Sequence, residues 1–453
     1  MKNMIGPSSG TGTFTNRLRR ISGTTTDSQN RYIFYLVIMA LMGWSLASYD
    51  VNLLVLALPD IAKSLDISQA ALGTLGFFVY AAQFCITIFA GYGMDTFGRR
   101  KVWMFCLTGS AVFTGLTYFV EGFWQLVAVR ALASGLAYAE LAVSITIVNE
   151  QVPAARRGLL YSIVQGGWPI GVFLASGVYL MFGHLGWRFV FLLGVIPLFA
   201  VIIGRMFIRE SERFEHVQQL KEAQKSGNSE AISRLLEHHA VDVGALERVS
   251  LKQLFSTPGV LRQQLVILSC AWIIYATSFV ASNFYIAYWL TTHKQFSSEA
   301  TSLLLLVSGG IGFFFYVLGG MLGERYGRRA VIIWTSLAIA PLGLLFWLVQ
   351  APWLVCVIYF CLYQATNGTW SGAGYAYQGE SFPTRMRGTA IGFLSAMQVL
   401  GFVLGTILWT FLSNHYAPDV TWLVLTVFVP CGLVITFLFR DIPPGQELED
   451  ISQ

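Results

Sequence analysis

Twelve long apolar segments dominate this chain of 453 residues and limit what it can fold into. A helix needs about 20 mostly apolar residues to cross the ~30 Å hydrocarbon layer of a membrane. The segments are roughly 32–57, 70–92, 102–120, 124–148, 159–182, 187–208, 263–291, 302–322, 330–349, 353–379, 389–413 and 419–439. Only 12% of the residues are charged, about half the share of a soluble protein. The sequence therefore predicts an all-α integral membrane protein with twelve transmembrane helices.

The basic residues predict how these helices are oriented, because Lys and Arg concentrate in cytoplasmic loops. If the N-terminus is cytoplasmic, all but four of the 29 Lys and Arg residues lie on the cytoplasmic side. The exceptions are Lys63, Arg188 and Lys294 at outer ends, and Arg130 within a segment. We therefore expect both termini to be cytoplasmic and the protein to span the cell (inner) membrane several times.

The segments divide into two groups of six. Residues 31–209 and 263–440 are expected to form two six-helix bundles, and residues 1–30 and 441–453 a disordered cytoplasmic leader and a tail. The connection 210–262 contains the runs 218–223 and 231–236, which are typical of short amphipathic helices on a membrane surface. This linker is either a solvated connector or a regulatory docking segment.

An internal repeat supports this division. The pattern G-x-x-x-[DE]-x-x-G-R-R occurs at 91–100 and again at 320–329, an offset of 229 residues. The pattern E-x-x-P-x-x-x-R-G occurs at 150–158 and at 380–388, an offset of 230 residues. Two motifs with nearly the same offset, at equivalent positions among the segments, indicate duplicated halves.

The repeated loops also suggest a conformational latch. Glycines let two helices and a tight turn approach closely, and a carboxylate can hold neighbouring arginines or a helix N-terminus. Such a cluster can hold the halves together in one state and open in another; the alternative is that the arginines only set the topology. The candidate latch residues are Gly91, Asp95, Gly98, Arg99, Arg100, Glu150, Arg157, Glu324, Gly327, Arg328, Arg329, Glu380 and Arg387.

With the doubled loop motif and the 6+6 arrangement, residues 30–440 resemble the major facilitator superfamily of secondary transporters. Three further features resemble its proton-coupled metabolite, sialate and aromatic-acid symporters. They are Arg130 followed by Glu140, the run Glu150-x-x-Pro-x-x-x-Arg157-Gly158, and 186–189 (Gly-Trp-Arg-Phe) at the start of the sixth segment. The resemblance implies transport by alternating access between two helix bundles.

Three ionisable residues lie within the segments, away from their ends: Asp50, Arg130 and Glu140. A charge at the bilayer centre costs about 2.5–3.5 kcal/mol, so each is a candidate functional residue. Asp50 is nine residues before Pro59, ~13 Å from the outer end of its helix at 1.5 Å per residue. Arg130 is eight residues after Gly122, ~12 Å from the same side. Opposite charges at one depth are expected to pair.

The pair suggests how protons drive transport. Protonation of Asp50 from the outside would release Arg130, whose guanidinium can then bind a carboxylate in a bidentate manner. Related sugar–proton symporters of the superfamily also use an acid in the first helix and an arginine in the fourth. The alternative is a permanent ion pair that ties the two helices together.

Glu140 lies ten residues after Arg130, or ~15 Å further toward the cytoplasm. We predict that it takes part in proton coupling with Asp50 and Arg130 as an inner proton relay. The alternative is that it packs against a cytoplasmic arginine.

In the second half no Asp, Glu, Lys, Arg or His lies within a segment interior. The polar content of these segments is neutral and aromatic. Amides avoid lipid, so faces that combine amides with aromatic rings favour a cavity for an organic molecule. In the tenth segment Tyr363, Asn367 and Trp370 are predicted to share one helix face. The candidate substrate-binding residues are Arg130, Tyr138, Gln165, Trp168, Tyr275, Asn283, Tyr363, Gln364, Asn367 and Trp370.

The sequence therefore favours proton-coupled uptake of a small organic acid, with an aromatic or sugar carboxylate as the leading candidate. The alternatives are a porter for a sugar, polyol or other neutral solute, and a drug exporter. No hydrolase, metalloprotease or Walker motif occurs, so we expect no enzymatic activity. All six cysteines lie in apolar runs, and we expect no metal, cofactor or nucleic-acid partner, and a monomer in the lipid bilayer.

Overall fold

The structure is a computed structural model that describes residues 27–151, 163–206, 259–382 and 384–442, with the single positions 208 and 219. The predicted amphipathic runs in the linker, and the predicted leader up to residue 26, lie outside these residues. The first helix begins at Asp27 and ends at Ser64, so it is longer at both ends than the segment 32–57.

The first half contains six long helical segments. Their elements are α2 (Asp27–Ser64), α3 (Gln69–Phe97), α4 (Arg99–Leu116) with η1 (Thr117–Phe119), α5 (Phe123–Gln151), α7 (Gly167–Phe182) with η3 (Gly183–Leu185), and α8 (Trp187–Arg205).

The second half contains six more. Its elements are α13 (Val260–Phe279), η4 (Val280–Phe284) and α14 (Ile286–Thr292); α15 (Ser298–Tyr326); α16 (Arg328–Leu348); α17 (Pro352–Tyr363), η5 (Gln364–Trp370) and α18 (Ser371–Glu380); α19 (Thr384–His415); and α20 (Pro418–Leu423), η6 (Val424–Phe428), α21 (Val429–Cys431) and η7 (Gly432–Leu438). The segments η4, η5 and η6 are π-helical, whereas η7 is a 3₁₀ helix.

The same local signals begin and end equivalent helices in both halves. Ser68 caps α3 by accepting a hydrogen bond from the backbone N–H of Ala71, and Ser297 caps α15 in the same way. Gly98 and Gly327, the last glycines of the repeated motif, have φ angles of 101° and 91° between consecutive helices. Residues with a side chain rarely adopt this conformation, which explains why both motifs carry glycine there.

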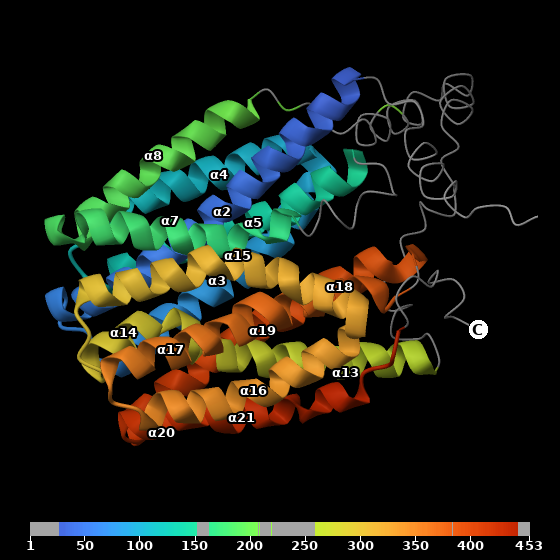
Figure 1. Cartoon of the computed structure of the whole chain (residues 1–453). Coiled ribbons are helices and arrows are strands. Elements are labelled where there is room, and N and C mark those ends of the chain that lie inside the picture. Colours follow the sequence, from blue (N-terminus) through green and yellow to red (C-terminus); the bar gives the residue numbers. More distant parts are fainter. Residues whose placement is uncertain are drawn as a thin grey trace, which may run out of the picture.

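The two halves lie side by side, with the blue-to-green helices in the upper part of Figure 1 and the yellow-to-red helices in the lower part. Between them α3 packs against α19, and α7 packs against α15. These pairs are the second segment with the eleventh and the fifth with the eighth. The repeat relates each segment of the first half to the one six places later, so it converts one pair into the other. The packing therefore follows the duplication seen in the sequence.

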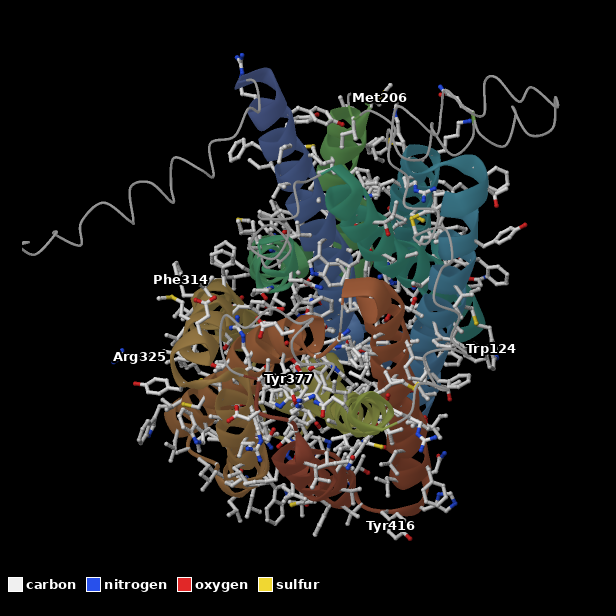
Figure 2. The ribbon with its side chains drawn as sticks, turned by 90° about the vertical axis from the view of Figure 1, so that its right-hand side faces the viewer. Trp124, Met206, Phe314, Arg325, Tyr377 and Tyr416 are labelled. Atoms are coloured by element: carbon white, nitrogen blue, oxygen red, sulfur yellow. The ribbon has the colours of Figure 1, made fainter. Side chains whose placement is uncertain are left out.

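Eleven helices of the described residues are long and apolar enough to cross a membrane. The tenth predicted segment is helical from Pro352 to Glu380, but its middle, Gln364–Trp370, is more polar than the rest. Large apolar side chains are exposed around the bundle, including Trp124 and Phe314, which point outward in Figure 2. Exposed apolar surface of this extent requires lipid.

One end of the molecule is closed by contacts between the halves. We call it the far end; it contains Ser64, Gln69 and Pro418, and lies opposite the terminal end, which contains Asp27 and Ile442. The hydroxyl of Tyr285 donates to the backbone oxygen of Leu72, and the indole N–H of Trp409 donates to that of Gln69, both at 3.2 Å.

Close helix packing accompanies these far-end bonds. A Cβ on Gly73 would lie 3.0 Å from the Cα of Thr410 in the other half. One hydrophobic core runs through both halves and includes Leu72, Tyr285 and Trp409, whereas a second core, which includes Ile33 and Ile147, lies in the first half alone.

The three basic residues of the far end occur at helix C-termini. Lys63 lies in the last turn of α2, and the side chain of Arg188 donates to the backbone oxygen of Val120 at the end of η1. Lys294 donates to the backbone oxygens of Trp347 and Val349 at the end of α16. Cations are stabilised at helix C-termini, which accounts for the departures from the charge bias of the sequence.

Candidate functional site

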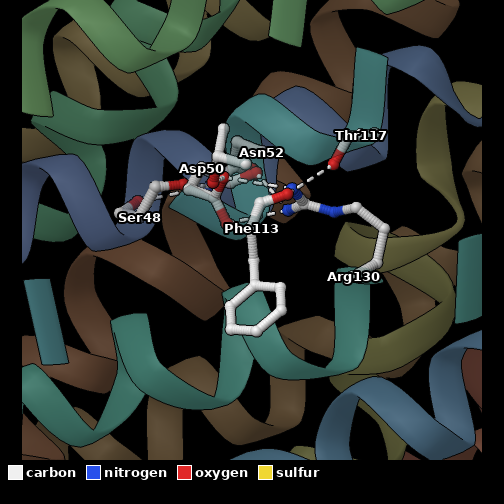
Figure 3. A network of polar contacts seen from close by, with 7 residues as sticks. Ser48, Asp50, Asn52, Phe113, Thr117 and Arg130 are labelled. Atoms are coloured by element: carbon white, nitrogen blue, oxygen red, sulfur yellow. Dashed lines mark hydrogen bonds and ion pairs between the residues drawn. The ribbon is translucent and has the colours of Figure 1, made fainter. Parts of the chain in front are cut away.

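The first and fourth segments meet at a buried ion pair. Asp50 on α2 and Arg130 on α5 bind in a bidentate manner, with Nη2 2.7 Å from Oδ2 and Nη1 3.2 Å from Oδ1. Nη2 also donates to the backbone oxygen of Asp50 at 3.2 Å. Neither side chain is exposed, and Figure 3 shows the guanidinium facing the carboxylate. The structure thus brings together the two residues whose equal depths suggested a pair.

Two further helices enclose this pair. Thr114 on α4 donates its hydroxyl hydrogen to Oδ1 of Asp50 at 2.5 Å. The guanidinium carbon of Arg130 lies 4.7 Å from the centre of the Phe191 ring on α8. Nε of Arg130 is buried without a hydrogen-bond partner among the described residues. The N–H at Nε is therefore available for a further acceptor.

Glu140 lies on the same helix as Arg130 but in a separate network. Its Oε1 accepts hydrogen bonds from the indole N–H of Trp103 at 2.8 Å and from the hydroxyl of Ser144 at 2.6 Å. Its side chain is fully buried. The described contacts link Glu140 to α4 and to its own helix, and they do not include Asp50.

Tyr275 and Trp370 of the predicted substrate set lie inside the second half. Their rings stack with centres 3.9 Å apart and planes at 4°. The indole N–H of Trp370 donates to Ser336 on α16 at 2.9 Å, and the hydroxyl of Tyr275 donates to the backbone oxygen of Thr366 at 3.1 Å. Both side chains are about 1% exposed. Their contacts connect α13, α16 and η5.

The predicted common face of the tenth segment, Tyr363, Asn367 and Trp370, stays a prediction. Two of its members contact the seventh segment, because Trp370 stacks on Tyr275 of α13 and Asn367 donates to Asn283 of η4. Gln364 beside them donates to the backbone oxygen of Ser308 on α15 at 2.9 Å, and Tyr363 also packs near Gly312 on that helix. The stretch Gln364–Trp370 is π-helical, and its wider turn changes the spacing at which residues share a face.

An amide pair lies between the two π-helical stretches. Asn367 on η5 donates to Oδ1 of Asn283 on η4 at 2.6 Å, and Asn283 is half-buried. In the first half, Tyr138 and Trp168 are half-buried and Gln165 is buried. Tyr138 on α5 lies near Tyr375 on α18, so these helices approach each other across the boundary between the halves.

Sequence reasoning missed several residues of this region. Thr114 has no signal in the sequence, because threonine is common in membrane helices. Tyr375 and Gln398 form a hydrogen-bonded pair, with the hydroxyl 3.1 Å from Oε1 and 2.9 Å from Nε2. The position of Gln398 within the otherwise apolar eleventh segment was a signal that could have been used. Trp44 was missed for the same reason as Thr114.

The contacts described for the latch residues lie within one half. Arg328 binds Glu380 with Nη2 3.1 Å from Oε1, and Nη2 also lies 3.5 Å from Glu324. Arg99 donates to the backbone oxygen of Met94 at 2.9 Å. The positions Gly91, Gly98 and Gly327 lie on or between the connected helices. Arg157 and the side chains of Asp95, Glu150 and Arg387 lie outside the described residues.

The second arginine of each motif has a matching partner in both halves. Arg100 donates to the backbone oxygen of Met206 after α8, and Arg329 donates to that of Phe437 within η7, both at 2.7 Å. These oxygens lie at the ends of the sixth and twelfth segments. A cation at a helix C-terminus is stabilising, so these two arginines fasten the last helix of each half to its third.

These features define a class of protein: a multi-pass membrane protein of two related helical halves, with a buried ion pair in the first half and π-helical stretches in the second. That is the architecture of a secondary transporter. A family model described as Major Facilitator Superfamily matches residues 33–314 and 267–452. The chain therefore belongs to the major facilitator superfamily, and it is a transporter and not an enzyme.

Curated relatives and solved structures agree with this assignment. The chain is 24% identical to the niacin transporter NiaP of Acinetobacter baylyi, over 91% of this chain and 94% of the relative. It is 24% identical to the cis,cis-muconate transport protein of the same organism, over 86% and 91%. The crystal structure of a D-xylose–proton symporter has the same fold, with a TM-score of 0.69, 20% identity and coverage of 92% and 99%.

Proposed function

We propose that this protein takes up a small carboxylated organic compound together with a proton, by alternating access. The terminal end is the cytoplasmic end, so both termini are cytoplasmic, the closed far end faces outward, and the protein acts as a monomer in the cell (inner) membrane. The proposal rests mainly on one observation, the fully buried pair of Asp50 and Arg130.

The pair suits a proton switch better than a structural bridge. Burying two charges costs several kcal/mol per ion before their attraction offsets it, so an ion pair is a poor device for stability alone. When the far end opens, water reaches Asp50 and a proton can neutralise it. Arg130 then loses its partner, and the carboxylate of the substrate replaces it. Substrate and proton leave together once the halves rock toward the cytoplasmic side.

The names of two relatives support a substrate that carries a carboxylate. Niacin and muconate are both small conjugated acids, and the chain matches their transporters over most of its length. Arg130 is the only Lys or Arg within the segment interiors, which favours a substrate with one carboxylate. Polar residues of the second half, such as the amide pair Asn283 and Asn367, would contact the uncharged part of the substrate.

A neutral, hydroxyl-rich solute is the second candidate. The amide pair and the Tyr375–Gln398 pair are uncharged hydrogen-bonding groups, and the D-xylose–proton symporter has the same fold. In that case Arg130 acts only in coupling, and replacing it would not alter which solutes bind.

Purified protein in liposomes with an imposed pH gradient tests the proposal. We expect uphill uptake of at least one compound from a panel of aromatic acids, sugar acids and short carboxylates, with no accumulation of the corresponding amides. Uptake should stop when an ionophore dissipates the pH gradient. Accumulation of neutral sugars but of no acid would favour the second candidate.

Closure of the far end gives a separate prediction. A Gly73→Leu variant should lose uphill uptake at least tenfold, because a side chain at this position overlaps Thr410 and keeps the far end open. The matched control is Gly392→Leu on α19, where an added Cβ meets nothing within 4 Å. Uptake and the labelling of an introduced far-end cysteine by an impermeant reagent measure the effect; equal uptake by both variants would contradict it.

A further inference from the structure

Three aromatic rings converge in the first half, one from each of three helices. Trp44 on α2 lies 5.7 Å from Tyr138 on α5 between ring centres, in an edge-on arrangement with planes at 72°. It lies 5.4 Å from Trp168 on α7, with planes at 40°. We call Trp44, Tyr138 and Trp168 the aromatic box.

Glycine packing fixes the box in place. A Cβ on Gly167 would lie 3.0 Å from the backbone oxygen of Leu41, and one on Gly171 would overlap Ser45 and Ser48. The helices α2 and α7 can therefore approach closely only because both positions are glycine. Ser48 then donates a hydrogen bond to the backbone oxygen of Trp168 at 2.7 Å. The two indoles are held side by side before any ligand arrives.

The box is reachable and has an unused donor. Tyr138 and Trp168 are half-buried, and Tyr138 lies near Tyr375 of the second half. Trp44 is 4% exposed, and its indole N–H is buried without a hydrogen-bond partner among the described residues. Buried donors are normally paired, so this one is suited to an acceptor that a ligand brings.

Two of the three box residues lie on the same helices as the ion pair. Trp44 precedes Asp50 by six residues on α2, or ~9 Å along the axis, and Tyr138 follows Arg130 by eight residues on α5, or ~12 Å. Both displacements run toward the terminal end. A carboxylate bound next to the box can meet the guanidinium once Asp50 releases Arg130 and the arginine side chain extends toward the terminal end.

We infer that the aromatic box binds the planar ring of the substrate, with the carboxylate toward Arg130 and a second acceptor on Trp44 Nε1. The transported acid is therefore a flat, conjugated monocarboxylate with a further hydrogen-bond acceptor, and not a sugar acid. A flat π system stacks on an indole face with a gain beyond the area it buries. A puckered, hydroxyl-rich ring presents C–H groups instead of a flat π face, so it gains less from the indoles, and hydroxyl donors turned toward the rings stay unpaired. This inference rests on the proposed function, because it assumes an acid as substrate.

Binding of three matched acids to purified protein tests the inference. Nicotinate is flat and carries a ring nitrogen acceptor, benzoate is flat without it, and cyclohexanecarboxylate keeps the carboxylate but is puckered. We expect both flat acids to bind at least tenfold more tightly than cyclohexanecarboxylate. In Trp44→Leu this ratio should fall to about one. In Trp44→Phe, which keeps a ring but removes the N–H, nicotinate should weaken about fivefold relative to benzoate.

Trp124→Phe is the control, because Trp124 is 66% exposed on the outer surface and should leave all three affinities unchanged. If Trp44→Leu does not fold, Tyr138→Leu removes another wall of the box and should lower the same ratio. An unchanged ratio of flat to puckered acids in the folded variants would overturn the inference, as would equal binding of all three acids by the wild type.

The two proposals fail in different ways. Uptake of cyclohexanecarboxylate driven by a pH gradient, without preference for flat acids, would remove the aromatic box and leave proton-coupled acid transport standing. A tenfold preference that depends on Trp44, without any accumulation in a pH gradient, would keep the binding site and remove the proposed function.

Discussion

An Asp50→Asn variant is expected to lose proton-driven accumulation while it still exchanges substrate across the membrane. Asparagine keeps the shape of the side chain and can still accept the hydrogen bond from Thr114, but it can neither bind nor release a proton. With one proton per monoanionic substrate, a gradient of one pH unit supports about tenfold accumulation, since a factor of ten corresponds to about 1.4 kcal/mol. The variant should bring the internal and external concentrations to about the same value.

The measurement compares net uptake with counterflow in the same liposomes. Counterflow reports binding and rocking without net proton movement, so it should persist at a rate within a few-fold of the wild type. Asp66→Asn is the matched control: Asp66 is exposed and has a φ angle of 51°, a conformation that asparagine tolerates. Full accumulation by Asp50→Asn would remove Asp50 from the coupling role.

The pairing of Asp50 and Arg130 could be predicted from their equal depth, together with the family resemblance that places the first and fourth helices next to each other. A rise of 1.5 Å per residue converts sequence position into depth within a membrane helix, and two opposite charges at one depth have a strong reason to meet. The helix starts at Ser68 and Ser297 were similarly accessible, since the cap is a local signal. The cap signal needs no knowledge of how the helices are arranged.

Contacts that depend on helix rotation could not be predicted in this way. Thr114 and Trp44 are ordinary residues of apolar helices until a neighbouring helix presents Asp50 or Trp168 to them. The π-helical stretch Gln364–Trp370 in the tenth segment could not be predicted either, because no local sequence signal reveals it. Such a local change of helical pitch rotates every later residue of the segment relative to an ideal α-helix.

Removing Arg130 is expected to destabilise the protein strongly, and removing both members of the pair much less. In Arg130→Met the carboxylate of Asp50 stays buried, with Thr114 as its remaining side-chain partner among the described contacts. Breaking a buried pair on one side costs about 3–5 kcal/mol. Asp50→Asn combined with Arg130→Met removes both charges and keeps the side-chain volumes similar. This double variant should therefore recover most of the lost stability.

Thermal unfolding of the four proteins in detergent, at one pH and salt concentration, gives a double-mutant cycle. We expect the midpoint of Arg130→Met to fall well below that of the wild type, and that of the double variant to return to within a few degrees. The double variant should also lack accumulation in a pH gradient, because stability is restored without the proton site. If Arg130→Met were as stable as the wild type, the two charges would not depend on each other, and a proton on Asp50 could not release Arg130 for a substrate.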